Sequence, residues 1–419
     1  SSATFLETTD DVNWRATDLS LYAAGTVDVS DASFQAADGL LSINANAFTG
    51  EFNTEVAQLS LVSRSSSISS DIVVNETDDL EIVSDVWGSA GGLNTRSGDV
   101  RVTVDGQEAL LTLSSGQITT GSSGGDISFV VDDINFLSGR DQVSGTGALT
   151  ISARNDGQNY NLGGAGQSMF GNDRSLAGAT GALVLAMGDL DALRDGFSVI
   201  NIGDGRGNAR MIIGDAEDAT IGVFDFSAKF TDDVVLTADE IIVAGDVQVA
   251  GALATNSRLL QIRVLNYQYP LGAPDSGLSA DTLDLNVLEQ VDLSGWLKAE
   301  NRIDLDVTAT QGEDTYVVYE GTTASLFGST SGSMEVFADD GVLRVATSAA
   351  LVSNAGFEVT GKRARIDLSA DAGVVLLGKS LVSASADDSV VSIEAGDYMH
   401  LESGSAVISG ARFEDSSRG

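Results

Sequence analysis

Pairs of aspartates are the residues of this 419-residue chain that could do acid–base chemistry. They stand at Asp78-Asp79, Asp132-Asp133, Asp232-Asp233, Asp339-Asp340 and Asp387-Asp388. Cleavage of a glycosidic bond needs two carboxyl groups about 5–10 Å apart in one cleft. Adjacent side chains of a strand point to opposite faces, so an Asp-Asp pair is not itself such a dyad. Because the chain holds 61 acidic residues, we interpret these pairs as turns or solvated faces and expect no catalytic residue.

His400 is the only histidine, so a Ser-His-Asp triad could be built only around it. Its context, Tyr398-Met-His-Leu-Glu402, predicts a strand on which His400 faces outward. One histidine cannot make a multi-histidine metal site. The absence of cysteine excludes disulfides and thiolate ligands. We therefore expect no cofactor-binding residue.

Calcium is the one candidate ion. Two corners rich in oxygen ligands stand at Gly203-Asp-Gly-Arg-Gly-Asn208 and Gly214-Asp-Ala-Glu-Asp218. The nonapeptide spacing of calcium-binding solenoids is absent, and Gly and Asp also suit tight corners without an ion. Calcium is therefore kept as a candidate ligand, and no residue is assigned to its binding.

Trp14, Trp87 and Trp296 are scattered along the chain, whereas a glycan-binding groove usually gathers exposed aromatic rings. We expect them in the core or at the ends of a stack. The segment Asn75-Glu-Thr77 fits a glycosylation acceptor, a pattern too frequent to assign a role.

Short apolar runs closed by Gly, Asp, Asn or Ser recur along the chain and must position these residues. Val100–Val104 is a typical run, and 47 glycines with only two prolines suit many short paired strands. Arg302-Ile-Asp-Leu305 returns as Arg365-Ile-Asp-Leu368, and Leu351-Val-Ser returns as Leu381-Val-Ser. Repeats at coil-sized spacing predict an elongated all-β solenoid, a parallel β-helix; an array of β-sandwich domains is the alternative.

One insert has a helical pattern, near residues 186–195. Leu185, Leu190 and Leu193 share a face, Asp189 could cap the start, and Gly196 could close the end. We expect a short helix packed against the strands.

The predicted organisation has three segments. Residues 1–140 form solenoid coils, 141–258 form a central cassette, and 259–419 form further coils after a loop holding Pro270 and Pro274. All three could belong to one continuous β-helix.

The net charge of −39 excludes binding to nucleic acid or to an anionic membrane through the chain's own field. No apolar run approaches the roughly 18 residues of a membrane span. Salt or divalent cations would relieve the self-repulsion, so we expect an extracellular setting. The first residues carry no secretion signal, and we expect a mature chain or a segment of a longer one.

The stretch from Gly145 to Gly251 resembles a cassette of very large bacterial surface proteins. The resemblance is carried by Gly145-Thr-Gly-Ala-Leu-Thr, Leu190-Asp-Ala-Leu-Arg-Asp-Gly-Phe-Ser-Val-Ile-Asn-Ile-Gly203 and Val235-Leu-Thr-Ala. The family is that of filamentous-haemagglutinin-like or β-strand-repeat proteins. It implies a right-handed parallel β-helix, secretion, and a stalk or fibre without catalytic residues. This chain departs from the family in its acidity and in lacking the N-terminal secretion domain.

These observations give three hypotheses. The first is a structural and interaction segment of a secreted bacterial cell-surface adhesin, filament or coat. Its partners would be further copies or neighbouring coils, joined head to tail, and a host-cell, partner-cell or glycan surface. The alternative is a secreted polysaccharide lyase or hydrolase, because pectin-degrading enzymes use the β-helix. The third is a calcium-dependent binding module within a larger adhesin.

Overall fold

A computed structural model describes most of the chain. The residues it describes are 12–15, 17–30, 32–86, 91–106, 109–122, 124–163, 181–214, 227–262, 277–293, 295–308, 333–348, 350–353, 356–377 and 380–409. Most of them form β-strands, and one short helix is the exception among the regular elements described. Neighbouring strands pair in parallel, as between Val100 and Ile127. The expected all-β parallel β-helix is therefore confirmed.

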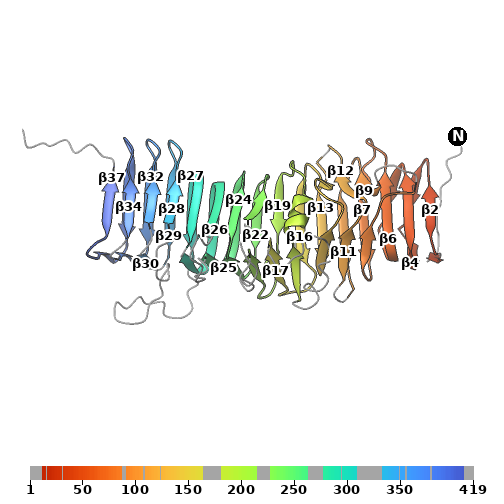
Figure 1. Cartoon of the computed structure of the whole chain (residues 1–419), viewed down its shortest axis with the longest axis horizontal. Coiled ribbons are helices and arrows are strands. Elements are labelled where there is room, and N and C mark those ends of the chain that lie inside the picture. The colour runs from red at the N-terminus through yellow and green to blue at the C-terminus, as the bar shows by residue number, and fades with distance from the viewer. Residues whose placement is uncertain are drawn as a thin grey trace, which may run out of the picture. The chain divides into compact units, whose positions relative to one another are not determined.

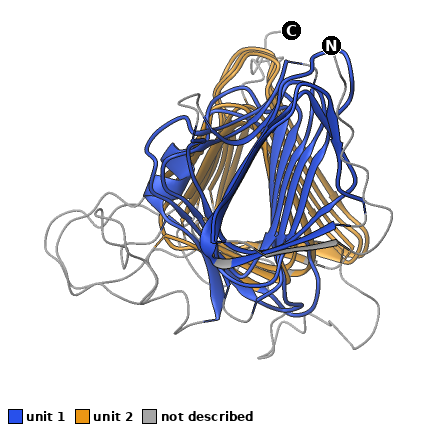
Figure 2. Ribbon diagram, turned by 90° about the vertical axis from the view of Figure 1, so that its right-hand side faces the viewer, with its two compact units in different colours: residues 1–209, 231–233 blue, residues 210–230, 234–419 orange. Residues whose placement is uncertain are grey.

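The chain divides into two compact units. The first comprises Ser1–Ala209 with Thr231–Asp233, and the second comprises Arg210–Phe230 with Val234–Gly419 (Figure 2). Viewed along its stack, each unit shows flat sheets that meet at corners around an apolar core. The predicted boundaries at 140 and 258 stay a prediction. Pro270 and Pro274 lie outside the described residues.

The strands of each unit follow one another in chain order along the stack (Figure 1). Those of the first unit are β1 Val12–Arg15, β2 Leu19–Tyr22, β3 Thr26–Asp28, β4 Ala32–Ala45, β5 Ala47–Thr49, β6 Phe52–Ser63, β7 Ile72–Glu76, β8 Leu80–Ile82, β9 Gly92–Thr95, β10 Val100–Val104, β11 Leu110–Leu113, β12 Gln117–Thr120, β13 Ile127–Val131, β14 Asp133–Phe136, β15 Val143–Ser144, β16 Ala148–Ala153, β17 Asn159–Leu162, β18 Ala182–Leu185 and β19 Val199–Ile202.

The second unit continues the same pattern. Its strands are β20 Arg210–Ile213, β21 Ser227–Phe230, β22 Val234–Thr237, β23 Glu240–Val243, β24 Asp246–Val249, β25 Ala252–Ile262, β26 Gly277–Leu293, β27 Trp296–Val307, β28 Ser333–Val336, β29 Val342–Thr347, β30 Ala350–Ser353, β31 Gly356–Val359, β32 Arg365–Ala370, β33 Gly373–Leu376, β34 Leu381–Ala384, β35 Val390–Ala395, β36 Tyr398–Leu401 and β37 Ala406–Ser409.

Columns of apolar side chains fill the core of each unit. In the first unit Val102 lies between Val74 of one neighbouring coil and Phe129 of the other, and all three are buried. The residues between them along each strand, such as Arg101, point outward because side chains alternate across a strand. Each buried Val, Leu or Phe contributes roughly 1.5–3 kcal/mol, so the stack is held mainly by burial between coils.

The helix α2 spans Met187–Asp191 and is shorter than expected. Leu185 belongs to β18, and Leu193 forms a bridge with Val143, so the chain returns to the sheet soon after the helix ends. Asp189 lies in the first turn rather than at the cap position, and its Oδ2 accepts from the N–H of Ala186 at 2.8 Å. The C-cap is Ala192, so the expected closure at Gly196 is wrong.

Candidate functional site

One corner of the first unit gathers polar side chains from successive coils. It follows β7, β10, β13 and β16, and we call it the acidic corner: Glu76, Asp78, Asp79, Asp105, Asp132, Arg154 and Asn155. The register stacks these residues because Glu76 pairs with Val104 and Val131 pairs with Ala153. The N–H of Asp105 donates to the carbonyl of Glu76 at 2.7 Å, which continues the ladder into the corner.

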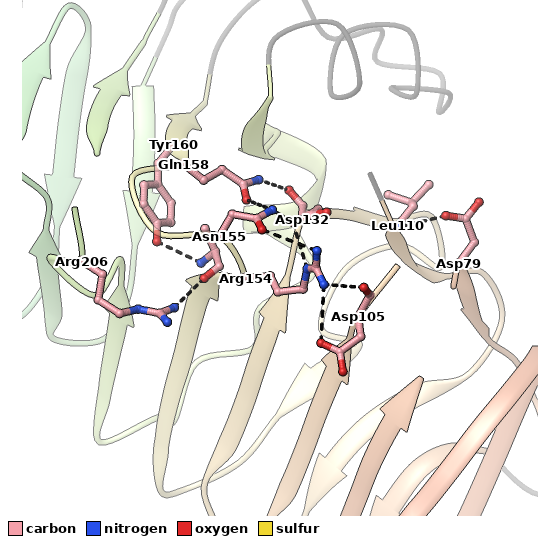
Figure 3. A network of polar contacts seen from close by, with 10 residues as sticks. Asp79, Asp105, Leu110, Asp132, Arg154, Asn155, Gln158, Tyr160 and Arg206 are labelled. Carbon is pink, nitrogen blue, oxygen red and sulfur yellow. Dashed lines mark hydrogen bonds and ion pairs between the residues drawn. The ribbon is translucent and has the colours of Figure 1, made fainter. Parts of the chain in front are cut away.

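Arg154 lies at the centre of the acidic corner (Figure 3). Its Nη1 donates to the carbonyl of Asp105 and lies 3.7 Å from the Oδ1 of the same residue. Its Nε lies 3.7 Å from Oδ1 of Asp132, whose side chain is only 8% exposed. A carboxylate so poorly hydrated is stable only with a nearby cation or hydrogen-bond donors. Arg154 therefore compensates charge from the two coils that precede its own.

Amide and hydroxyl groups complete this network. Asn155 Nδ2 donates to Oδ1 of Asp132 at 2.7 Å, and Gln158 Nε2 donates to the carbonyl of Asp132 at 2.7 Å. The buried hydroxyl of Tyr160 accepts from the N–H of Ala153 at 2.9 Å. Burial raises the pKa of Tyr160 to about 12, so the phenol stays protonated. These groups bind one another and the backbone, which is how a corner is held rigid.

Glu76 is a fully buried carboxyl at the start of the acidic corner. It accepts from the N–H of Thr77 at 2.8 Å and from the N–H of Val56 at 3.2 Å. The strand β6 continues without a break here, whereas its neighbour β7 ends at Glu76 and pairing resumes only at β8. Val56 therefore has no backbone partner on this side, and the carboxylate of Glu76 accepts its N–H instead. Burial raises the pKa of Glu76 to about 7, against the lowering effect of these hydrogen bonds.

The neighbours of Glu76 are also acidic. Burial raises the pKa of Asp78, and the charges of Glu55 and Asp79 act in the same direction, whereas a hydrogen bond with Glu76 opposes them. Two carboxyl groups in such contact are more stable when one of them holds a proton. The pair is thus able to hold a proton near neutral pH, although Glu76 is closed to solvent.

A different corner holds an aspartate ladder, formed by Asp71, Asp99 and Asp126. Each lies directly before a strand, and its Oδ1 accepts the backbone N–H of the equivalent residue in the next coil. The donors are Asp99 at 3.0 Å, Asp126 at 2.9 Å and Ala148 at 2.7 Å. The short aspartate side chain suits the spacing of about 4.8 Å between parallel strands. The sequence analysis did not predict this ladder. An aspartate directly before the apolar runs that form β7, β10 and β13 is the feature that could have indicated it.

The structure places the predicted aspartate pairs at corners or strand starts, where their carboxylates bind backbone groups. Asp79 accepts from the N–H of Leu110 at 3.0 Å, and Asp133 accepts from the N–H of Val184 at 2.8 Å. Asp232 accepts from the N–H of Gly196 at 3.0 Å. A carboxylate held in this way stabilises a corner.

The remaining pairs form an alternating corner in the second unit, made of Asp339-Asp340, Lys362-Arg363 and Asp387-Asp388. Asp340, Arg363 and Asp388 all adopt the left-handed conformation, with φ of 61°, 57° and 61°. Arg363 donates to both oxygens of Asp340 at 2.6 Å. This bidentate contact raises the pKa of Arg363 and lowers the pKa of Asp340. The corner is therefore a stack of opposite charges at one repeated backbone geometry.

His400 lies on β36 opposite Val375 and is exposed, as its sequence context indicates. Trp296 on β27 is half-buried, with the Nζ of Lys298 4.9 Å from its ring centroid. The side chain of Trp14 and the whole of Trp87 lie outside the described residues.

The first predicted calcium corner already contains a cation of the chain itself. Asp204 accepts from the backbone N–H of Arg206 at 3.0 Å and from its Nε at 2.5 Å, and Arg206 also lies 3.3 Å from Asp156. Residues 215–218 of the second corner lie outside the described residues. Within the described ranges, no group of three or more His, Cys, Asp or Glu is placed to hold a metal ion. Calcium binding stays a prediction.

No helix in the described part has both the length and the apolar character needed to cross a membrane. Comparison of the chain with protein families, with curated proteins and with solved structures found no match.

Proposed function

We propose that this chain is a structural segment of a secreted bacterial surface protein, serving as an adhesin stalk, an extracellular filament or a coat. The observation that carries the proposal is the use of the acidic side chains. Asp79, Asp99 and Asp126 bind backbone N–H groups of neighbouring coils, and Asp132 lies against Arg154. A hydrolase or lyase of polysaccharides would instead direct carboxylates towards a substrate.

The resemblance of Gly145–Gly251 to filamentous-haemagglutinin-like proteins supports the same role and suggests an extracellular location. The net charge of −39 also suits a setting in which salt screens repulsion between coils. A host cell, a partner cell or a glycan would then be contacted by the outward side chains of the sheets. Bound calcium would relieve charge repulsion between neighbouring acidic groups.

The experiment is immunogold electron microscopy of intact source cells, with antibody raised against this chain. Label along fibres or a continuous coat is the expected result. In parallel, the purified chain is incubated with a panel of acidic and neutral polysaccharides, and the reducing ends and unsaturated products are measured. Protein found free in the medium together with cleavage of one polysaccharide would replace the structural role by the enzymatic one.

A further inference from the structure

Two hydroxyl groups lie in the core of the second unit, among aliphatic side chains. Thr255 and Ser257 belong to β25 and face inward on the same side of the strand as Leu253. Thr255 is fully buried and Ser257 is 6% exposed. In the neighbouring coils Thr255 lies between Leu236 and Leu285, which are also fully buried. The two hydroxyls are therefore surrounded by columns that otherwise hold only apolar side chains.

Neither hydroxyl has a hydrogen-bond partner within the described part of the chain, and the oxygen atoms of both are closed to solvent. Burying a hydroxyl without a partner costs free energy, so almost all such groups in native proteins bind a protein group or an ordered water. The leucines above and below Thr255 have no polar side-chain atom to offer. The partner must therefore be small and come from outside the chain.

The column that contains Ser257 has room for such a partner. Ser257 lies opposite Val287 of the next coil, and Val287 lies opposite Val307 of the coil after that. In the preceding coil this level is occupied by Ala238, which is buried and follows the pairing of Thr237 with Asn256. Alanine and serine are smaller than valine, so these two coils fill less of the core here. Because protein cores are closely packed, this volume suits a small guest.

The backbone beside the two hydroxyls is irregular. In the pairing of β25 with β26, Ser257 lies opposite Val287 and Leu259 lies opposite Gln290, so the register shifts between them. A shift of this kind interrupts the ladder and leaves backbone groups that need another partner. An internal water typically makes about three hydrogen bonds. Two hydroxyls and one backbone group at this shift would supply them.

We propose that Thr255 and Ser257 bind one ordered water molecule in the core of the second unit. Residues two apart on a strand stand about 6.6 Å apart, and a water with hydrogen bonds of about 2.8 Å on each side spans most of that distance. A water can donate and accept, as two hydroxyls require, whereas a calcium ion takes six to eight oxygen ligands. The water fills the volume that Val287 and Val307 fill in the following coils. This inference does not depend on the proposed function.

A crystal structure of the full chain tests the inference directly. Density for one water is expected within about 3.2 Å of both Thr255 Oγ1 and Ser257 Oγ. The double variant Thr255→Val, Ser257→Val should lack this density, because valine at position 257 occupies the same volume and neither side chain can bind water. A natural chain with no water between the two hydroxyls would overturn the proposal.

Urea unfolding distinguishes a hydrated hydroxyl from one that has no partner at all. Thr255→Val keeps the shape of the side chain, and its urea midpoint should fall because the bound water loses one partner. Removing a hydroxyl without any partner would instead raise the midpoint. The matched control is Thr237→Val, because Thr237 is half-buried on the outward side of β22 in the preceding coil, and its midpoint should stay unchanged.

Adding Ser257→Val to Thr255→Val should expel the water and bring the midpoint back to that of the natural chain. This recovery separates a lost water from a general loss of packing, which a second substitution would only worsen. A midpoint above that of the natural chain for Thr255→Val alone, or a double variant less stable than the single one, would refute the water site.

Discussion

The buried carboxyl of Glu76 predicts that one substitution stabilises this protein at alkaline pH. The folded chain raises the pKa of Glu76 from its ordinary value of 4.5 to about 7. As the pH rises, the unfolded chain therefore loses this proton before the folded chain does. The contribution of Glu76 to stability is complete below pH 4.5, declines between pH 4.5 and 7, and is lost above pH 7.

The magnitude follows from the pKa difference. At about 1.4 kcal/mol for each pKa unit, a rise from 4.5 to about 7 corresponds to about 3 kcal/mol. In Glu76→Gln the amide stays neutral and its carbonyl can still accept from Val56 or Thr77. Losing the second acceptor costs about 1 kcal/mol. The variant should therefore be about 2 kcal/mol more stable than the natural chain at pH 8.

Urea unfolding followed by circular dichroism at pH 4.5 and pH 8 measures this difference. Glu81→Gln is the control, because Glu81 lies on the outward side of the adjacent strand β8 and the substitution removes the same charge. At pH 4.5 we expect Glu76→Gln and the natural chain to agree within about 1 kcal/mol. If Glu76→Gln is less stable than the natural chain at pH 8, the carboxylate is well stabilised when charged and our reasoning is wrong.

The other predictions concern the corners and the candidate ion. Asp99→Ala should lower the free energy of unfolding by about 1–2 kcal/mol, because Asp126 loses the acceptor for its N–H. Asp99→Asn should recover most of that stability. Equal urea midpoints for the alanine variant and the natural chain would exclude a stabilising ladder. Arg154→Met should lower the free energy of unfolding by about 1–3 kcal/mol, less than the loss expected when a fully buried ion pair is broken. Adding Asp132→Asn should restore part of this stability in the same urea assay. If calcium binds, the melting temperature should fall when a chelator replaces calcium; the same melting temperature in both would refute calcium binding.

The architecture was predictable because period-two runs such as Val100–Val104 show directly which side chains face the core. The length of the helix could not be predicted, because Leu185 and Leu193 fit either one face of a helix or positions in the sheet. Pairing with neighbouring coils places both of them in the sheet. Glu76 could not be recognised either. Its burial depends on β6 running straight where the next coil turns, and this difference between neighbouring coils is not visible in either segment alone.

The aspartate ladder gives the stack a polarity. In each of its bonds the carboxylate belongs to the earlier coil and the N–H to the later one, and the same holds for Asp18 with Leu40. A finished coil thus offers acceptors already in place to a coil that is still unfolded. The ladder would therefore favour folding from the N-terminal side, which is also the order in which a ribosome releases the chain. Each new coil can then be completed as it emerges, without waiting for the rest of the sequence.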